Sequence, residues 1–597
     1  MKKQLLRLLP VAAVLLTASC TDDQYDISNV DTESRFTAKG LVIPLNMSPI
    51  MLDNIISIEK NGDIKKDDEG NYYFQKDGTF QSEIVKADEI KITKPNDISQ
   101  SVTVTVALST TIQNNWKTYA PGMTIKQIKE AGLSSAVGID DDTQIFSVTI
   151  NASSTTFNMN AENIDSKITI INKLGLDPLP MNLDIRLGAL NNVVNKVNIS
   201  NLTVDLPSGM TIQEANVYNP SDGKLKYNAL EVLVGTPKTI ATVTGLDCNA
   251  MGTNLFNKST HKFTYSKECS ISGTATITVS DLSENTTLAD ITAGATSCTC
   301  VVNFSNDLVI NSFSGGINYT VNSITVDPVN IENLPEILQE SGTEIELTNP
   351  QLYLTVVNPF FVNQITATAG LCISSITDGQ ESTFPTQSLT FGQTTNKKVL
   401  SPDDPKDSEF SHQAFPELKN LLTGEGKDGE KKIPETLNIK VDNPILDANN
   451  VINFELGDDK GKQITGDWKF YTKLALTDET KISYNKIWDD WGSKDLNGLT
   501  VEKATVSFDF KKDVALDAKS IEFFLHGKEG KLYGITNNVK GDANVITIEM
   551  TGGPVSNITG GELKVKLIGQ GKGINTTQKI EVSNLRMKVD GYYDKEF

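Results

Sequence analysis

The 597-residue chain has only three histidines and four arginines, and it has no run of apolar residues long enough to span a membrane. A membrane-spanning helix needs about 20 consecutive apolar residues. The charged side chains are 75 acidic and 54 basic, which gives a formal net charge of −21. Nucleic-acid binding needs clustered cations, so this composition argues against a nucleic-acid partner. With 38% hydrophobic residues, the chain can form about four domains with cores of their own.

The motifs of common enzymes are missing as well. His261, His412 and His526 stand alone, without the His-Glu-x-x-His pattern of metalloproteases. A Gly-x-Ser-x-Gly nucleophile elbow is absent, and so is a Cys-x-x-Cys pair that would suggest zinc. Isolated histidines are usually structural or exposed. We therefore predict no catalytic residue, no metal site and no cofactor other than lipid.

The first twenty residues have the composition of a secretion signal. Three cationic residues precede an apolar stretch from Leu8 to Leu16, and small residues then lead to Cys20. Such an apolar core is too short for a mature membrane helix and typical of a signal peptide, which we place at residues 1–19. These residues carry three positive charges and no negative charge, so their removal changes the formal charge to −24.

The run Leu-Thr-Ala-Ser-Cys that ends at Cys20 resembles the lipobox of bacterial lipoproteins. Thr17 occupies a position where that family usually has Leu. In the family the cysteine is acylated and becomes the first mature residue. The resemblance implies that acyl chains on Cys20 hold the protein on a lipid bilayer, since each buried CH₂ adds about 0.8 kcal/mol. A plain signal peptide that is cut nearby is the alternative.

Acidic residues follow the cysteine directly, with Asp22 and Asp23 as the first two. They look like the surface-export signal of Bacteroidota outer-membrane lipoproteins. This resemblance implies a protein that is lipid-anchored to the outer membrane and faces the extracellular side. The alternative is that the acids only keep a flexible tether, residues 20–35, solvated in a periplasm-facing protein.

The remainder of the chain shows the period-two alternation of strands with one buried face. In the run from Lys503 to Phe510, apolar and polar residues alternate strictly, and residues 563–567 repeat the pattern. β-Branched residues dominate such runs, and Asn, Asp and Gly lie between them. We predict a mainly β fold of tandem antiparallel β-sandwich (Ig-like) units with a few short helices.

Short helices are indicated at two places. Thr124 and Gln127 form the pattern of a capping box, which predicts a helix from residue 125. Ser48 and Pro49 have the pattern of a helix start and predict a helix over residues 50–56.

Composition shifts suggest consecutive domains with soft boundaries. The stretch at 401–434 is rich in charged residues, Gly and Pro, and we predict that it is a linker. The predicted domains are an N-terminal β domain at 36–165, a middle β domain at 166–330, a third β unit with this linker at 331–438, and a C-terminal β-sandwich at 439–597.

Five cysteines follow Cys20, and an exported protein can form disulfides. Cys248 and Cys269 are separated by 20 residues and could close a hairpin loop, so they are a candidate disulfide. Cys298 and Cys300 would share one face of a strand, which is an awkward geometry for a bond between them. The odd number leaves at least one free thiol, best explained as a small buried hydrophobe.

The strongest indication of ligand binding is aromatic. Trp468, Trp488 and Trp491 fall within 24 residues, and Asp489 and Asp490 lie between the last two. Aromatic rings can cover the apolar face of a sugar while carboxylates accept hydrogen bonds from its hydroxyls. The alternative is that these rings build the core of the C-terminal domain.

The neighbouring stretch contains candidate ligands for calcium. Asp490, Asp495 and Asn497 supply oxygen atoms and Gly498 a turn, but the spacing of an EF-hand is missing. A plain loop is the alternative, and calcium remains unsupported by the sequence.

These features favour a non-catalytic binding module on the cell surface, with a glycan or another surface protein as partner. The alternative is a structural or adhesive envelope protein, similar to fimbrial lipoproteins, in which sheet edges pair between chains and cleavage follows Arg35. A polysaccharide hydrolase is the weaker third hypothesis, because paired acids alone do not define one.

Overall fold

The computed structural model describes residues 33–45, 50–51, 64–106, 108–292, 295–331, 343–429, 431–489, 498–511, 515–527, 532–537, 543–549, 554–556 and 558–596. Within these residues strands greatly outnumber helices, and nearly all strand pairs are antiparallel. The predicted mainly β sandwich fold is therefore confirmed.

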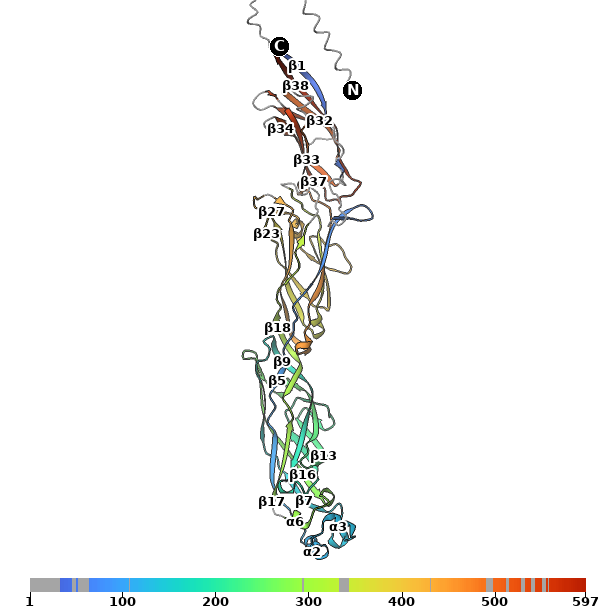
Figure 1. The fold of residues 1–597 in the computed structure, drawn as a ribbon, viewed down its shortest axis with the longest axis vertical. Helices are drawn as coiled ribbons and strands as arrows, with labels where there is room; N and C mark the ends of the chain where they lie inside the picture. Colours follow the sequence, from blue (N-terminus) through green and yellow to red (C-terminus); the bar gives the residue numbers. More distant parts are fainter. Residues whose placement is uncertain are drawn as a thin grey trace, which may run out of the picture.

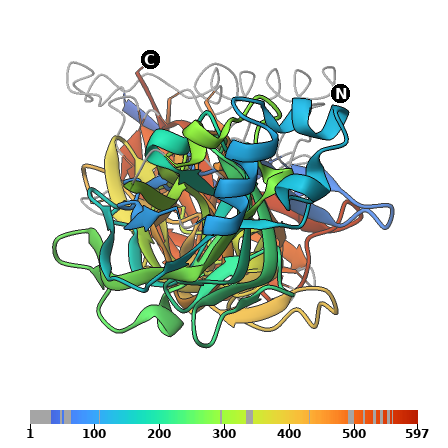
Figure 2. The same ribbon diagram turned by 90° about the horizontal axis from the view of Figure 1, so that it is seen from below.

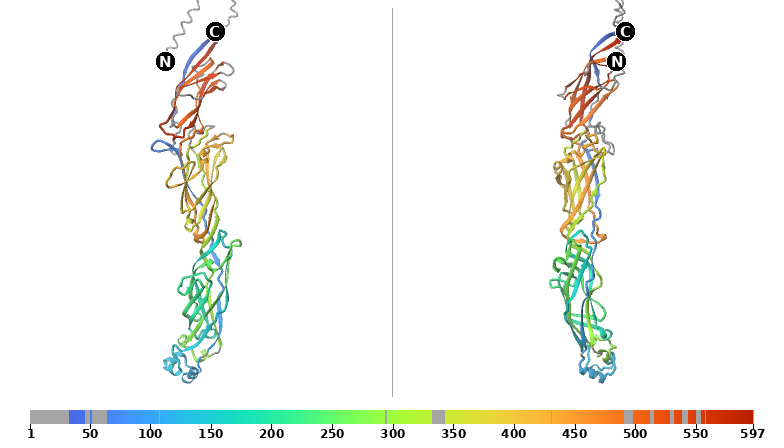
Figure 3. Two further views of the ribbon diagram at one scale, coloured as in Figure 1. Left: turned by 180° about the vertical axis from the view of Figure 1, so that it is seen from behind. Right: turned by 90° about the vertical axis from the view of Figure 1, so that its left-hand side faces the viewer.

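The described chain forms an elongated body (Figure 1). Strands β1 (Glu33–Pro44) and β38 (Lys579–Glu596) lie at one pole, and helices α2 (Thr110–Tyr119), α3 (Ile125–Glu130) and α6 (Leu288–Ile291) lie at the other. Three units follow one another between the poles, as the side views in Figure 3 show. We call them the basal unit, which contains β1 and β38, the middle unit, and the distal unit, which carries the helices.

The units are nested in sequence. The basal unit is built from residues 33–51 and 482–596, the middle unit from 64–81 and 324–473, and the distal unit from 90–320. The distal unit is thus inserted into the middle unit, which is itself inserted into the basal unit. Figure 1 shows this as blue and red segments that share the pole of the basal unit.

The predicted consecutive domains, 36–165, 166–330, 331–438 and 439–597, do not match these sheets. Residues 36–44 pair with the C-terminal strand β38, and β4 (Tyr72–Gln81) pairs with β30 (Thr465–Lys473). Periodicity locates strands but carries no information about which strands pair, so the sequence pattern could not show the nesting.

The predicted linker at 401–434 is part of the middle unit. It contains β26 (Ser411–Ala414) and a short 3₁₀ helix, η6 (Pro416–Asn420). Phe415 and Leu418 are fully buried, and Leu421 is nearly so. The prediction was wrong because the many charges of this stretch masked a few apolar residues that anchor it in the core.

The basal unit has two antiparallel sheets. One has the strand order β1-β38-β32-β35, with β2 paired to β38 and β36 to β32, and the other has the order β31-β37-β33-β34. The further strands are β2 (Ile50–Met51), β31 (Ile482–Trp488), β32 (Leu499–Lys511), β33 (Leu516–Gly527), β34 (Leu532–Asn537), β35 (Ala543–Glu549), β36 (Val555–Ser556) and β37 (Ile558–Gly569).

The middle unit packs the sheet β26-β25-β21-β30-β4-β3 against the strands around β29 and β22. Its elements are β3 (Ile64–Lys66), β19 (Ile324–Thr325), β20 (Val329–Asn330), β21 (Gln351–Val357), η5 (Pro359–Asn363), β22 (Thr366–Thr377), β23 (Gln380–Thr383), β24 (Gln387–Phe391), β25 (Thr395–Ser401), β27 (Gly424–Glu425), β28 (Lys431–Lys432), β29 (Thr436–Glu455) and η7 (Asp458–Lys460), besides those given above.

The distal unit combines a sheet around β10 and β16 with a second sheet around β9. Its strands are β5 (Ile90–Ile92), β6 (Ile98–Thr105), β7 (Gln144–Ile150), β8 (Thr155–Ala161), β9 (Ile168–Arg186), β10 (Lys196–Asp205), β11 (Met210–Ile212), β12 (Tyr218–Asn219), β13 (Lys224–Leu233), β14 (Lys238–Asp247), β15 (Phe256–Asn257), β16 (Lys262–Thr278), β17 (Ala295–Phe304) and β18 (Leu308–Thr320).

Short helices complete the distal unit. Besides α2, α3 and α6, these are α4 (Ser134–Val137), α5 (Cys248–Met251), η3 (Gly188–Leu190) and η4 (Val279–Asp281). Seen from below, the blue helices of this pole stand in front of the strands (Figure 2).

Of the two helices predicted from local sequence patterns, one is present and the other is contradicted at its start. The capping box before α3 is present: Thr124 Oγ1 accepts a hydrogen bond from the Gln127 N–H, and the Gln127 side chain accepts one from the Thr124 N–H. The helix predicted over 50–56 is contradicted at its start, where Ile50 and Met51 form β2 against β38. Tertiary pairing overrides a local helix signal there.

One continuous sheet joins the distal and middle units. β18 pairs with β9 on one side and with β29 on the other, so its hydrogen-bonded ladder extends from the distal unit into the middle unit. The register shifts at Gly315 on both sides of β18. A Cβ built on Gly315 would lie 1.9 Å from the carbonyl oxygen of Ile170, so only glycine allows the strands to approach this closely.

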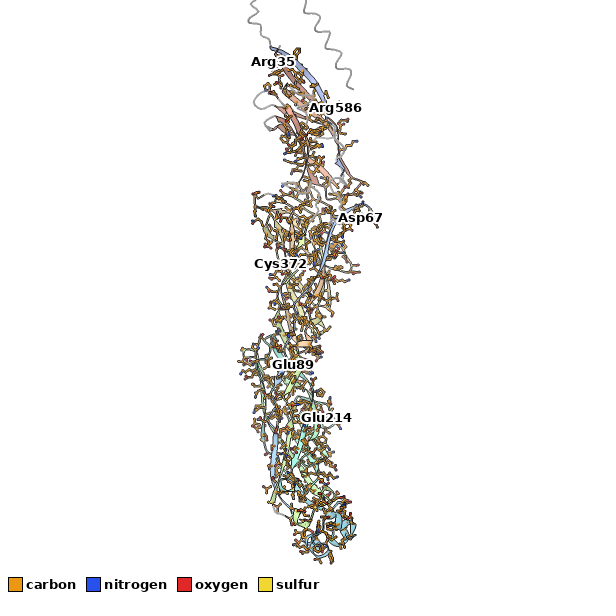
Figure 4. The ribbon with its side chains drawn as sticks, in the orientation of Figure 1. Arg35, Asp67, Glu89, Glu214, Cys372 and Arg586 are labelled. Atoms are coloured by element: carbon orange, nitrogen blue, oxygen red, sulfur yellow. The ribbon has the colours of Figure 1, made fainter. Side chains whose placement is uncertain are left out.

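A polar clamp holds the segment that leads from β4 into the distal unit. The Glu83 carboxylate accepts hydrogen bonds from the Tyr319 hydroxyl, at 2.9 Å, and from the backbone N–H and side-chain amide of Asn322, at 3.0 and 2.6 Å. These hydrogen bonds, led by the Asn322 N–H, lower the pKa of Glu83, because they favour its charged form. Glu89, farther along the same segment, marks this joint in Figure 4.

Replacing Gly315 by alanine should destabilise the protein. The new Cβ would clash with the backbone of Ile170, which is held in place by the pairing of β9 with β18. We expect the Gly315→Ala variant to lose roughly 3 kcal/mol of unfolding free energy, measured as a lower midpoint in urea denaturation. Gly573→Ala is the matched control, because a Cβ there would meet none of the described atoms within 4 Å. Equal midpoints for both variants would contradict the close approach.

Candidate functional site

The predicted aromatic patch is not assembled by the described residues. Trp468 lies on β30 of the middle unit and is 5% exposed. The described residues offer its buried Nε1–H no hydrogen-bond acceptor, and a Cβ on Gly78 would come within 2.8 Å of this nitrogen. Trp468 is therefore a core residue and not part of a surface platform.

Trp488 lies on β31 of the basal unit, in another sheet from Trp468. Its ring centroid is 6.0 Å from that of Phe523, a fully buried residue, so Trp488 packs on the core side of the sheet. Asp489 is exposed at the end of β31, and Asp490 and Trp491 lie outside the described residues. The alternative of core aromatics thus holds for Trp468 and Trp488. They belong to the cores of two different units.

The predicted disulfide is not formed either. Cys248, at the start of α5, and Cys269, on β16, are free buried thiols in the described chain. Burial raises the pKa of each to about 12, so both thiols stay protonated near neutral pH. Cys298 and Cys300 are also free and buried. Both lie on one face of β17, as predicted from their spacing. These cysteines act as small core residues.

Other predicted residues lie beyond the described chain. Cys20, Asp22 and Asp23 fall there, and so do the calcium candidates Asp490, Asp495 and Asn497, while the neighbouring Gly498 is described with φ +83°. Where the structure describes the chain, no group of three or more His, Cys, Asp or Glu side chains is placed to hold a metal ion.

A polar groove of about 590 Å³ lies on the middle unit, and we call it the β25 groove. It is formed by the end of β24, the turn that follows, β25 and the edge strand β26. Its lining consists of hydroxyl, amide and charged side chains together with one glycine: Thr390, Gly392, Gln393, Thr395, Asn396, Lys397, Lys398, Glu409 and Ser411.

Asn396 fixes the turn at the groove. It is buried, its Oδ1 accepts a hydrogen bond from the Gln393 N–H at 3.1 Å, and its Nδ2 donates to the Gln393 carbonyl at 2.6 Å. A weaker contact of 3.4 Å from Nδ2 reaches the Val356 carbonyl on β21. The turn is therefore held to the sheet by one side chain, which leaves Gln393 and Thr395 exposed.

An ion pair crosses the groove. The Lys397 Nζ lies 2.7 Å from Glu409 Oε2, and the two side chains are 39% and 67% exposed, respectively. The stability of the fold does not depend on this ion pair, because an exposed pair of this kind contributes only about 0–1 kcal/mol. Both charged groups are thus available to a ligand.

Two aromatic rings flank this ion pair. Phe410, next to Glu409, meets Tyr353 of β21 edge to face with ring centroids 4.9 Å apart. Lys397 Nζ lies 5.5 Å from the centre of the Phe410 ring, and Lys469 Nζ lies 4.7 Å from that of Tyr353. Both rings are half-buried, so an apolar surface adjoins the polar lining.

No local sequence pattern indicates this groove. Its residues come from strands separated by turns, and Glu409 and Phe410 lie in the stretch that was predicted to be a linker. Phe410, which directly precedes β26, meets Tyr353 because β26 pairs in parallel with β25 and β25 is the neighbour of β21.

No family model matches the chain, and no curated protein matches it. A crystal structure of a protein from Parabacteroides distasonis, described as secreted, aligns with 47% of this chain and 90% of its own, at 14% identity and a TM-score of 0.31. A triple jelly-roll protein of an archaeal virus covers 79% of this chain and 94% of its own, at 8% identity and a TM-score of 0.10.

A structure from Sulfolobus turreted icosahedral virus gives similar values, with 79% and 96% coverage, 9% identity and a TM-score of 0.10. TM-scores this low do not establish a shared fold. Among the helices that the structure describes, none is long and apolar enough to cross a membrane.

Substitution of Trp468 separates a core role from a ligand-binding role. We expect Trp468→Ala to lower the unfolding free energy by about 3–5 kcal/mol because it empties a buried site. Trp468→Phe should cost clearly less, since it retains an aromatic ring and removes an N–H that has no acceptor. Urea denaturation followed by circular dichroism measures both. A Trp468→Ala protein with unchanged stability would contradict the core assignment.

Proposed function

We propose that the protein is a lipid-anchored cell-surface binding module without catalytic activity, and that it binds a glycan in the β25 groove. The observation that carries this proposal is the composition of the groove. Hydroxyl, amide and charged side chains line it, and the Tyr353 and Phe410 rings adjoin it. Polar groups beside an aromatic surface suit a sugar, which has hydroxyls at its edge and an apolar face.

The size of the groove agrees with this ligand class. Small-molecule sites commonly measure about 300–1,000 Å³, and the β25 groove has about 590 Å³. It lies along an open side of the middle unit, between β24 and the edge strand β26. A sugar chain would therefore lie along the groove and extend beyond it.

The placement of the chain ends supports the anchoring part of the proposal. Glu33 and Glu596, the first and last described residues, are cross-strand partners at the pole of the basal unit. Acyl chains on Cys20 would attach this pole to the bilayer, because the proposed tether joins β1 there. The middle and distal units would then extend away from the membrane (Figure 3). The β25 groove, which lies on the middle unit, would be held between the two poles.

Removal of either charge in the groove should weaken glycan binding. A glycan array identifies a binding sugar, and isothermal titration calorimetry then compares variants. We expect Lys397→Ala and Glu409→Gln each to reduce affinity about tenfold, which corresponds to about 1.4 kcal/mol.

Lys431→Ala is the matched control for the groove variants. Lys431 Nζ pairs with Glu425 at 3.1 Å, and its side chain is 41% exposed, compared with 39% for Lys397. Lys431 lies outside the groove lining. The Lys431→Ala variant should therefore bind the sugar with the same affinity as the unchanged protein. No array signal at all, or equal losses in all three variants, would contradict the glycan proposal.

The anchor is tested through Cys20. We expect Cys20→Ala to abolish labelling with a radioactive or clickable fatty acid and to release the protein from membranes. Protease treatment of intact cells should digest the unchanged protein if it faces outward. Fatty-acid labelling of the Cys20→Ala variant would contradict acylation at this residue, and full protection from protease would contradict surface display.

A second candidate function is an adhesive or structural one, in which sheet edges pair between chains. The observation that favours it is the edge position of β1, which carries the exposed apolar side chains of Phe36, Leu41 and Val42. Such edges pair readily with other strands. Arg35, where cleavage was predicted, is exposed at the start of β1 beside Asp594 (Figure 4). A mature chain that stays intact and monomeric would contradict this candidate.

A further inference from the structure

β1 is the first described segment after the predicted anchor at Cys20. Its pairing geometry determines how a pulling force would pass from the anchor into the rest of the basal unit. Any pull on the distal or middle unit reaches the membrane through this strand and the tether before it. We propose that β1 and β38 form a load-bearing clasp that carries tension between the membrane and the distal pole in shear. The inference rests on the anchoring at Cys20 in the proposed function.

The register of the two strands sets the direction of loading. β1 begins at the pole, where Glu33 faces Glu596, and runs toward the middle unit until Pro44 faces Arg586. A pull on Glu33 toward the membrane therefore draws β1 lengthwise along β38. Interstrand hydrogen bonds lie perpendicular to the strands, so this movement strains all of them together and no single bond can break first.

A bulge in β1 opposes sliding. The register shifts between Ala38 and Leu41, so that Lys39 and Gly40 together lie opposite the single residue Asp590, and β1 has one extra residue relative to β38. Gly40 adopts φ +69°, and its N–H donates a hydrogen bond of 2.7 Å to Asp590 Oδ1. A bulge pins the register of paired strands, because a slipped strand would have no place for the extra residue.

Side-chain and backbone contacts fasten both ends of the clasp. Near the pole, Arg35 Nε donates a hydrogen bond of 3.0 Å to Asp594, and the guanidinium carbon lies 3.7 Å from the centre of the Tyr592 ring. At the inner end, the Leu45 N–H donates to the Leu585 carbonyl at 3.1 Å, and Leu45 is buried. The contacts thus span the whole length of β1.

β38 passes the load into the basal sheet. It is an interior strand, with β1 on one side and β32 on the other, and its pairing with β32 extends from Tyr593 to Glu581. Tension on β1 is therefore shared by at least two neighbouring strands. The same pair would open easily if its two ends at the pole were pulled apart, because the hydrogen bonds would then break one after another.

Single-molecule pulling in two directions tests the clasp. The full chain receives one handle at the N-terminus and a second either in the exposed turn at Gly122 of the distal pole or at the C-terminus. Pulling between the N-terminus and Gly122 shears β1 along β38, whereas pulling between the two termini unzips the pair. The 12 residues of β1 already span about 40 Å as a strand, so unzipping swings this length outward and adds extension. Release in shear adds little length, because β1 is already extended along the pull, and the event is identified there as the rupture whose force the Asp590→Ala variant changes.

We expect the release of β1 from β38 to require a higher force in the shearing arrangement than in the unzipping arrangement. Asp590→Ala should lower the shearing force, because the bulge loses its hydrogen bond. Glu231→Ala is the control, since it breaks a surface pair with Lys196 in the distal unit and should leave the force unchanged. Equal forces in both arrangements, or release of β1 at a lower force in shear, would overturn the proposal.

The outcome is independent of the glycan assay and of the acylation assay. Pulling uses purified protein without sugar and attaches handles in place of lipid. Failure of glycan binding or of fatty-acid labelling would therefore refute the proposed function while leaving the measured strength of the clasp unchanged, and a weak clasp would leave both other assays intact.

Discussion

The pairing of β18 with both β9 and β29 is the constraint on which the arrangement of the units depends. Domains joined by linkers usually move relative to one another. Here the distal and middle units share a hydrogen-bonded ladder, and bending at their joint would break strand pairs. Phe454 reinforces this region from β29, with ring centroids 5.6 Å from Phe313 and 6.4 Å from Phe360. The Glu83 clamp ties the other crossing segment to the same place. The result is a stiff connection made of ordinary sheet.

Much of the fold class could be predicted from the sequence, because burial imposes a period of two on each strand. Ala504, Val506 and Phe508 alternate in the sequence and are all buried in the basal unit. The partner of each strand could not be predicted in this way. Arg35 and Asp594 are 559 positions apart in the sequence, and yet Arg35 Nε lies 3.0 Å from Asp594 Oδ1. No local pattern encodes such a pairing, so consecutive domains were the natural but incorrect prediction.

The candidate site shows the same limit in another form. An aromatic cluster in the sequence does not tell which way each ring faces, and Trp468 and Trp488 both face cores. No local sequence pattern indicates the β25 groove, because its residues come from separate strands and from a charged stretch that was predicted to be a linker. Its Lys397 and Glu409 form an exposed pair that adds little to stability. Substitutions there can therefore test the proposed ligand binding without unfolding the protein, whereas substitutions of the core tryptophans cannot.

The nested topology also imposes an order in time. The distal unit is continuous in sequence and can close as soon as residue 320 has been made, the middle unit must wait for β30, and the basal unit for β38. β1 is thus among the first segments to emerge and among the last to find its partner. Pairings of such long sequence separation form slowly, and Phe36 and Val42 stay unpaired with β38 meanwhile. Assembly proceeds from the pole with the helices toward the pole with the chain ends, so β1 depends on protection from aggregation until the last strand arrives.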